Sequence, residues 1–292
     1  MHYLVHLQNI INVSTPERKV KIIDGLARQL EKSKTETLIN GDKYVRFIFK
    51  LVVAHDLFAK YGKIFKAIRF DNEYNQELLA LLIAQNELKL AKQYCREQIG
   101  YNFREEYSVI YWAFLKEIAL AEKDEKSLAT VLAALFPWTF NFDDYLFISQ
   151  SLPEEERKKW RTKMLTKARN TSGIYKMNAV AFYFKLADTE KTYRKMIEYI
   201  RYNTPYPIIL QYFEPMAMAE KDRFLKAMLD KSDDYGWGWK SDDDNACFPE
   251  LYRLFVKHYT ADYLKMAIKS AEKERYFRQN DIINYIRKQL YS

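Results

Sequence analysis

The chain has 292 residues, with 47 Lys or Arg against 39 Asp or Glu, so its formal net charge is +8. A hydrophobic content of 48% excludes a disordered chain, and 2 Cys exclude a disulfide scaffold. The scarcity of Gly and Pro, 7 of each, argues against an all-β protein, which needs many tight turns.

The first 70 residues are interpreted as three or four helices. Thr15-Pro16-Glu17 is a helix start, because Thr is a favoured cap and Pro is tolerated at the first helical position. Residues 1–19 lack the basic region and the cleavage site of a signal peptide, and no apolar run is long enough to span a membrane. We therefore expect a cytoplasmic protein without a membrane partner, whose residues 1–70 form a capping bundle or the first turns of a repeat.

Two helical hairpins are predicted next. Apolar residues in Asn75–Ile99 recur at three- and four-residue steps on both sides of the polar Gln85-Asn86-Glu87. Residues Tyr107–Phe136 show the same pattern on both sides of Glu122-Lys123-Asp124. Each polar break predicts a short turn between two amphipathic helices.

Residues 107–168 resemble residues 171–232 when the chain is shifted by 64 positions. Identity is 9 of 62 positions, and the apolar stripes and polar turns coincide. Trp160 falls on Phe224, so we expect these two side chains to occupy equivalent buried positions. The predicted hairpin turns lie near residues 86, 124, 152, 188, 215 and 260. Their spacing is in the range of stacked helical hairpins.

The stretch LLALLIAQNELKLAKQYCREQI (78–99) resembles a tetratricopeptide-type hairpin. The matching positions are Asn86 at the turn glycine, Leu88 at the turn aromatic, Ala91 at the small residue of the second helix and Tyr94-Cys95 at the following aromatic. DEKSLATVLAAL (124–135) repeats the pattern with Ala129 at the small position. The turn glycines, the closing proline and the steady spacing of the family are absent, so the resemblance is to the α-solenoid superfamily over residues 73–290.

From this resemblance and the helical pattern we expect an all-α fold, a right-handed α-α superhelix of TPR-like hairpins with about 13 to 16 helices. Residues 71–292 would form the helical-hairpin repeat region.

The helix predicted to start after Pro153 carries a basic stripe. Lys159, Lys163 and Lys167 lie at four-residue steps on one face, apart from its apolar side. Such a stripe can contact phosphates. The alternative is a solvated face that is weakly stabilised by Glu154–Lys158 and Glu155–Lys159 pairs.

Residues 231–249 form a long loop with five Asp and two Trp, Trp237 and Trp239. The tryptophans either anchor a partner or fold back onto neighbouring helices. In the second case Trp237→Ala would cost about 3 kcal/mol or more. Asp242, Asp243 and Asp244 lack the spacing of a calcium loop.

The chain contains no phosphate-binding glycine loop, zinc-protease motif or nucleophile elbow. His2 and His6 lie one helical turn apart but lack further zinc ligands nearby. Cys95 lies on an apolar helix face and Cys247 adjoins Phe248, so we expect neither thiol to have a reactive role. We therefore expect neither a metal site nor a cofactor.

Stacked hairpins offer an extended concave surface, and such surfaces usually bind macromolecules. The first hypothesis is therefore a non-enzymatic scaffold that binds a protein or a peptide, with Trp237, Trp239 and the lysine stripe as candidate contacts. The second is a nucleic-acid-binding repeat that uses the basic helix face, which salt-dependent binding would distinguish. The third is an enzyme with a carboxylate site between helices, which a pocket holding two or more acids would favour.

Overall fold

A computed structural model describes residues 2–32, 41–200, 204–231, 246–274 and 281–291. These residues form an all-α fold in which helices pack against one another, without a strand in the described ranges. None of the helices described is long and apolar enough to cross a membrane. The prediction of an all-α protein is confirmed.

The chain divides into two compact units, Met1–Leu135 and Phe136–Ser292, each with its own hydrophobic core. The helices of unit 1 are α1 (His2–Val13), α2 (Pro16–Lys32), α3 (Gly41–Ala54), α4 (Phe58–Tyr61), α5 (Asn72–Ala84), α6 (Leu88–Tyr101) and α7 (Val109–Glu122), with the 3-10 helices η2 (Gly62–Ile64) and η3 (Glu105–Ser108). Helix α8 (Glu125–Thr139) runs from unit 1 into unit 2.

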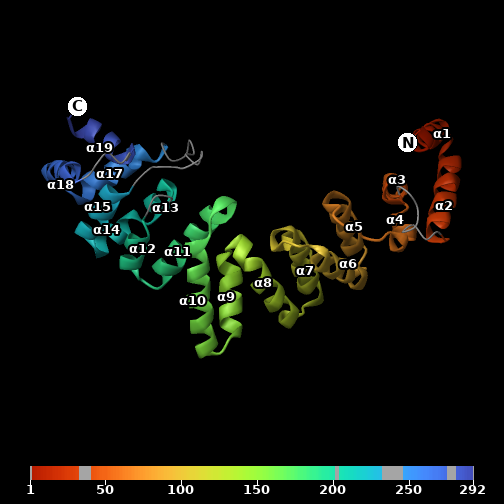
Figure 1. The fold of residues 1–292 in the computed structure, drawn as a ribbon, viewed down its shortest axis with the longest axis horizontal. Helices are drawn as coiled ribbons and strands as arrows, with labels where there is room; N and C mark the ends of the chain where they lie inside the picture. Colours follow the sequence, from red (N-terminus) through yellow and green to blue (C-terminus); the bar gives the residue numbers. More distant parts are fainter. Residues whose placement is uncertain (1, 33–40, 201–203, 232–245, 275–280, 292) are drawn as a thin grey trace. The chain divides into compact units, whose positions relative to one another are not determined.

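The remaining helices of unit 2 are α9 (Phe142–Ser151), α10 (Glu154–Asn170), α11 (Lys176–Thr189), α12 (Tyr193–Tyr199), α13 (Tyr206–Gln211), α14 (Phe213–Ala219), α15 (Lys221–Asp230), α17 (Phe248–His258), α18 (Ala261–Glu274) and α19 (Asp281–Tyr291), with the 3-10 helix η4 (Gly173–Tyr175). Within this unit α10 lies between α9 and α11, as Figure 1 shows.

The described residues contain 18 α-helices, more than the 13 to 16 expected. One reason is Pro215, which lies inside α14. Its ring has no N–H to donate to the Gln211 carbonyl and would clash with that carbonyl in a continuous helix. The chain therefore breaks at Tyr212, between α13 and α14, about one helical turn before the turn predicted near residue 215.

The other predicted turns are confirmed. Asn86 and Lys123 adopt left-handed backbone conformations, with φ of 60° and 55°, between the helices of their hairpins. The turn expected near residue 188 lies slightly later, where Lys191 has φ 54°. Thr15 caps α2 as expected, because its hydroxyl accepts the Arg18 N–H at 3.4 Å.

Aromatic rings fill the centre of each core. In unit 1 the Phe49 ring meets those of Phe65 and Tyr74 edge to face, with centroids 5.2 and 4.9 Å apart. In unit 2 the Phe213 ring meets those of Phe224 and Phe255 in the same way, both at 4.9 Å. Such pairs add to the stabilisation by apolar burial.

The two segments related by the 64-residue shift have similar element orders. The first runs η3, α7, α8, α9, α10, and the second runs η4, α11, α12, α13–α14, α15. Phe224 is fully buried, but Trp160 is only half-buried against Phe136. The expectation of two equivalent buried positions is therefore met at Phe224 and not at Trp160.

Candidate functional site

The predicted lysine stripe belongs to α10, whose start is tied to the preceding helix. Glu154, Glu155 and Glu156 occupy the first turn, where the helix dipole favours negative charge. The Arg157 guanidinium donates to the carbonyls of Ser149 and Leu152, at 2.9 and 3.2 Å, and so satisfies the end of α9. These contacts fix the direction in which α10 leaves α9.

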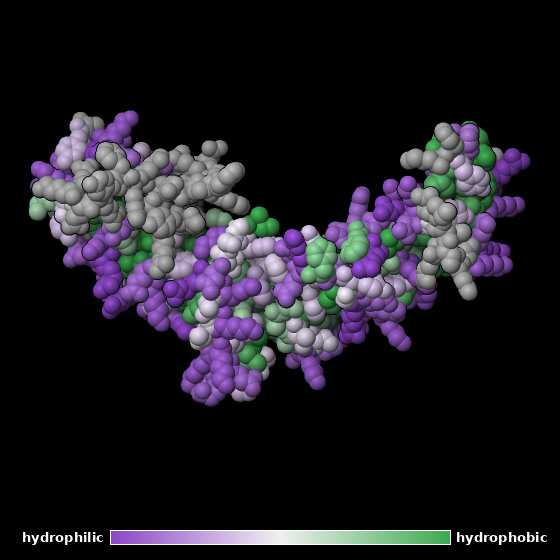
Figure 2. Space-filling view, viewed as in Figure 1, coloured by the Kyte–Doolittle hydropathy of each residue, from purple (hydrophilic) through white to green (hydrophobic). Residues whose placement is uncertain are grey.

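Lys159, Lys163 and Lys167 are exposed on α10, on a face apart from the buried Met164 and Ala168. Figure 2 shows mostly hydrophilic residues where α9 meets α10, at the bottom of the view. None of the three lysines contacts an acidic side chain among the residues described.

Two of the three acids at the start of α10 pair with a different lysine. Lys158 contacts Glu154 at 3.1 Å and Glu155 at 2.9 Å. The predicted Glu154–Lys158 pair is thus confirmed, whereas the predicted Glu155–Lys159 pair is not formed. The charges of the stripe remain available to a ligand.

A groove of about 340 Å³ lies beside this helix, between α10, α11 and α12. We call it the basic groove. Its apolar lining comes from Leu165, Tyr183 and Tyr199, and the two tyrosine rings stack with centroids 4.2 Å apart. The Tyr199 hydroxyl accepts from the Lys176 ammonium at 3.1 Å and donates to the Ala168 carbonyl at 3.4 Å. Burial raises the pKa of Tyr183, so this phenol stays neutral at ordinary pH.

Two acids near the groove are already paired. The Arg161 guanidinium donates through Nε and Nη2 to the two carboxylate oxygens of Glu190, so this contact is bidentate. The Glu198 carboxylate contacts Arg194 at 3.1 Å and Arg223 at 3.7 Å.

Arg169 of α10 and Lys195 of α12 line the same groove. Neither contacts a carboxylate in the part of the chain that the structure describes. Thr162 and Thr166 place hydroxyl groups beside them. The groove therefore holds these two cationic side chains and two hydroxyl groups beside the stacked rings of Tyr183 and Tyr199. Such an arrangement can bind a carboxylate or a phosphate.

Arg169 and Lys195 were missed by sequence reasoning. Arg169 lies outside the four-residue steps of the lysine stripe, and Lys195 lies on another helix. No local spacing pattern joins them, because only the packing of α10, α11 and α12 places both at one groove.

Other candidate residues are not part of this site. Trp237 and Trp239 lie outside the described residues. Cys95 is buried, and burial raises the pKa of its thiol to about 12, whereas Cys247 is half-buried. No group of His, Cys, Asp and Glu suited to a metal ion occurs among the residues that could be searched.

Comparisons of this chain with protein-family models, with curated proteins and with solved structures find no match. Its function has to be inferred from the geometry of its own surfaces.

Proposed function

We propose that this chain is a non-enzymatic helical-repeat protein, a right-handed superhelix of TPR-like hairpins, that binds an acidic segment of a partner protein. The binding surface is the basic groove together with the lysine stripe of α10. The observation that carries the proposal is the pair Arg169 and Lys195, which line one groove from two helices without contacting an acid of the described chain.

The floor of the groove favours a peptide over a nucleic acid. Single-stranded nucleic acids stack their bases on open aromatic faces. Tyr183 and Tyr199 are buried and stack on each other, so their faces are not open to bases. A peptide can place apolar side chains beside Leu165 while its carboxylates meet the two cations.

A nucleic-acid contact is the second hypothesis, and Lys159, Lys163 and Lys167 support it. Their exposed ammonium groups could neutralise phosphates of a duplex. The peptide hypothesis ranks first because a phosphate backbone would leave the apolar lining of the basic groove, Leu165, Tyr183 and Tyr199, unused.

The enzyme hypothesis has less support. It requires at least two carboxylates in one pocket. The basic groove has a single carboxylate, Glu198, and this group is engaged by Arg194 and Arg223.

The test is a titration of the full chain with a fluorescein-labelled peptide in which Glu alternates with Leu. We expect saturable binding that weakens as salt is added, since exposed charges are screened. The double variant Arg169→Gln, Lys195→Gln should weaken binding by about tenfold or more. Lys226→Gln is the matched control, because Lys226 is an exposed lysine of unit 2 on α15, outside the groove lining.

A duplex DNA titration separates the two hypotheses. Duplex binding tighter than peptide binding, lost when Lys159, Lys163 and Lys167 are changed to Glu, would replace the first hypothesis with the second. Peptide binding that is unchanged in the Arg169→Gln, Lys195→Gln variant would contradict the proposed groove.

A further inference from the structure

Unit 1 exposes four aromatic side chains around the end of α6, in two groups of ring contacts. Phe70, Tyr101, Phe103 and Tyr107 have exposed fractions of 60, 47, 75 and 42%. Single exposed apolar residues are common on protein surfaces, but several in one place mark interaction sites. We call these four residues, together with Arg69 and Arg104, the aromatic edge.

Two arginines lie against these rings. The Arg69 guanidinium is 4.6 Å from the ring centroid of Phe70 and 5.2 Å from that of Tyr101. Arg104 lies 5.7 Å from the Phe103 ring, which meets the Tyr107 ring edge to face at 5.6 Å. The continuous segment 101–107 joins the two groups of contacts.

Arg69 contacts no carboxylate within the described ranges, whereas Arg104 contacts Glu106 at 3.4 Å. The rings hold the Arg69 guanidinium by cation–π contacts, which leave its N–H groups unused. A guanidinium held in this way is suited to a carboxylate, which it can bind through two N–H groups.

The backbone of Phe70 is in an unfavourable conformation. Its φ is 63°, in the left-handed region that bulky residues avoid because Cβ meets backbone atoms there. Burial of the Phe70 side chain cannot offset the conformational free energy that this backbone costs, because the side chain is mostly exposed. Lys123 and Lys191 adopt the same conformation at hairpin turns, and Phe70 differs from them in placing a large exposed aromatic ring there.

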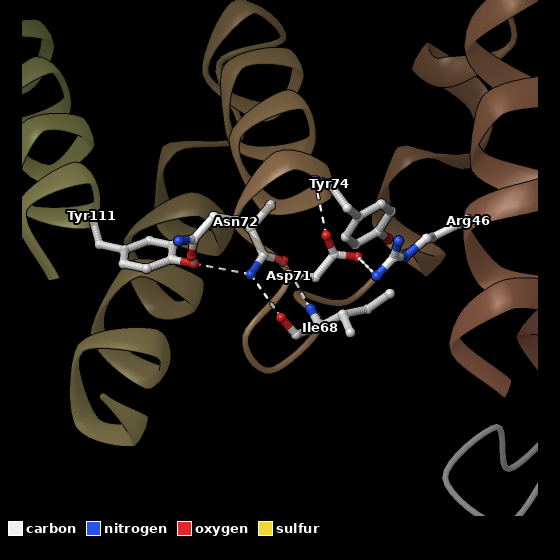
Figure 3. A network of polar contacts seen from close by, with 7 residues as sticks. Arg46, Ile68, Asp71, Asn72, Tyr74 and Tyr111 are labelled. Atoms are coloured by element: carbon white, nitrogen blue, oxygen red, sulfur yellow. Dashed lines mark hydrogen bonds and ion pairs between the residues drawn. The ribbon is translucent and has the colours of Figure 1, made fainter. Parts of the chain in front are cut away.

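Buried polar contacts enforce the conformation on both sides of Phe70 (Figure 3). Before it, the Asn75 side chain accepts the Ile68 N–H at 2.8 Å and donates to the Ile68 carbonyl at 2.7 Å. After it, Asp71 is ion-paired with Arg46 of α3 and accepts the Tyr74 N–H at 3.4 Å. The Arg69–Phe70 pair is thus presented by a loop that is held at both ends, which lowers the entropy cost of binding.

We propose that the aromatic edge docks a segment of a partner protein that carries a carboxylate next to a large apolar side chain. The carboxylate would bind Arg69, and the apolar side chain would pack on Phe70, Tyr101 and Phe103. Tyrosine and arginine are enriched among the residues that dominate binding energies at protein interfaces. This site is separate from the basic groove and does not rest on the proposed function.

Local charge favours a protein over a nucleic acid at this surface. Residues 66–73 and 101–107 together hold three basic and four acidic side chains. A phosphate backbone would meet no net positive charge here, although the rings alone could stack on bases. The partner segment needs only one carboxylate, at Arg69.

The test is a selection of peptides from a random phage-displayed library on the immobilised full chain. We expect enriched peptides to carry Asp or Glu next to Phe, Trp, Tyr or Leu. As synthetic peptides they should bind at least about fivefold more weakly to Arg69→Gln and to Phe103→Ser. Leu120→Ser is the matched control, since Leu120 is an exposed apolar residue of α7 outside the aromatic edge. Arg169→Gln, Lys195→Gln should leave this binding unchanged, which separates it from the basic groove.

A second variant tests the role of the strained residue. Asn adopts the left-handed conformation more readily than Phe, so Phe70→Asn should leave Tm within about 2 °C or raise it. The same change should weaken binding of the selected peptides at least about fivefold. A fall in Tm beyond that range would show that Phe70 serves folding, and would overturn the proposal.

Three binding results would also overturn it. The first is a selection without enrichment, and the second is a set of peptides without carboxylates or with unchanged affinity for Arg69→Gln. The third is oligodeoxythymidylate that binds more tightly than the best peptide and loses affinity in Arg69→Gln and Phe103→Ser.

Discussion

At the residue scale, one buried amide holds much of the polar interior of unit 1 together. Asn75 is fully buried, and its side chain bonds both backbone polar groups of Ile68. Its amide also donates to the Tyr111 hydroxyl at 3.1 Å, and that hydroxyl donates to the Asn72 side chain at 3.0 Å (Figure 3). The loop before α5 and the start of α7 therefore depend on one side chain.

Asn75→Ala should lower the free energy of unfolding by about 3 kcal/mol, because it leaves the Ile68 N–H and carbonyl without their partner. Urea unfolding followed by circular dichroism measures this change. Gln93→Ala is the control. Among the described residues the exposed Gln93 amide donates to Glu97 alone, one helical turn away, and its loss should cost less than about 0.5 kcal/mol. A cost for Asn75→Ala as small as that of the control would contradict this account.

The two cysteines should differ in reactivity. Cys95 is fully buried, and desolvation raises the pKa of its thiol to about 12, so the reactive thiolate is scarce at pH 8. Cys247 is half-buried. Iodoacetamide should therefore modify Cys247 first, and Cys95 only after denaturant is added, as mass spectrometry of the digested peptides would show. Equal rates for both thiols in the folded protein would disprove the assignment of Cys95 to the core.

At the element scale, helix ends are set by caps and by residues that cannot continue a helix. Asn141 precedes α9, and its side-chain oxygen accepts the N–H groups of Asp143 and Asp144 at 2.9 and 3.1 Å. Further along the chain, Pro215 divides an apolar run into α13 and α14. Both effects act over three or four residues.

Asn141→Ala should destabilise the protein by about 1 kcal/mol, the usual cost of losing a side-chain cap. Asn141→Asp should be nearly neutral, because the carboxylate keeps the acceptor and suits the positive end of the helix dipole. Chemical denaturation of the two variants measures both effects. If Asp and Ala at this position were equally destabilising, the acceptor oxygen would not be the source of the stabilisation.

At the scale of the whole molecule, the boundary between the compact units lies within α8. Val131 and Leu135 of this helix pack in the core of unit 1, whereas Phe136 packs in that of unit 2. A continuous helix therefore supplies side chains to two separate cores. The division proposed from the sequence, residues 1–70 and 71–292, concerns the repeat organisation and stays a prediction.

Stability should fall at alkaline pH. Burial raises the pKa of Cys95 to about 12 and that of Tyr94 to about 12, and it also raises the pKa values of Tyr74 and Tyr259. The unfolded chain releases these protons at lower pH, near 9 for the thiol and about 10 for the phenols. The free energy of unfolding is therefore unaffected by these groups below about pH 9, and it falls as pH rises towards 12 because the unfolded chain loses their protons first.

Calorimetric melting between pH 8 and pH 11 checks this expectation. Tm should be steady at first and then fall above about pH 9. Cys95→Ala removes one contributing group, so its Tm should start lower and then fall less steeply with pH. A Tm that stays constant to pH 11 would contradict the expected linkage.

Local signals in the sequence were sufficient to predict the helical class, the cap at Thr15, the turns at Asn86 and Lys123, and the lysine stripe of α10. Periodicity, capping and charge spacing act over a few residues, so a single sequence contains them. Tertiary structure alone decided that Arg169 and Lys195 line one groove, that Asn75 anchors the loop at Ile68, and that Phe70 adopts a left-handed conformation. These outcomes depend on which distant helices pack together, because contacts between residues far apart in the chain have no fixed spacing in the sequence.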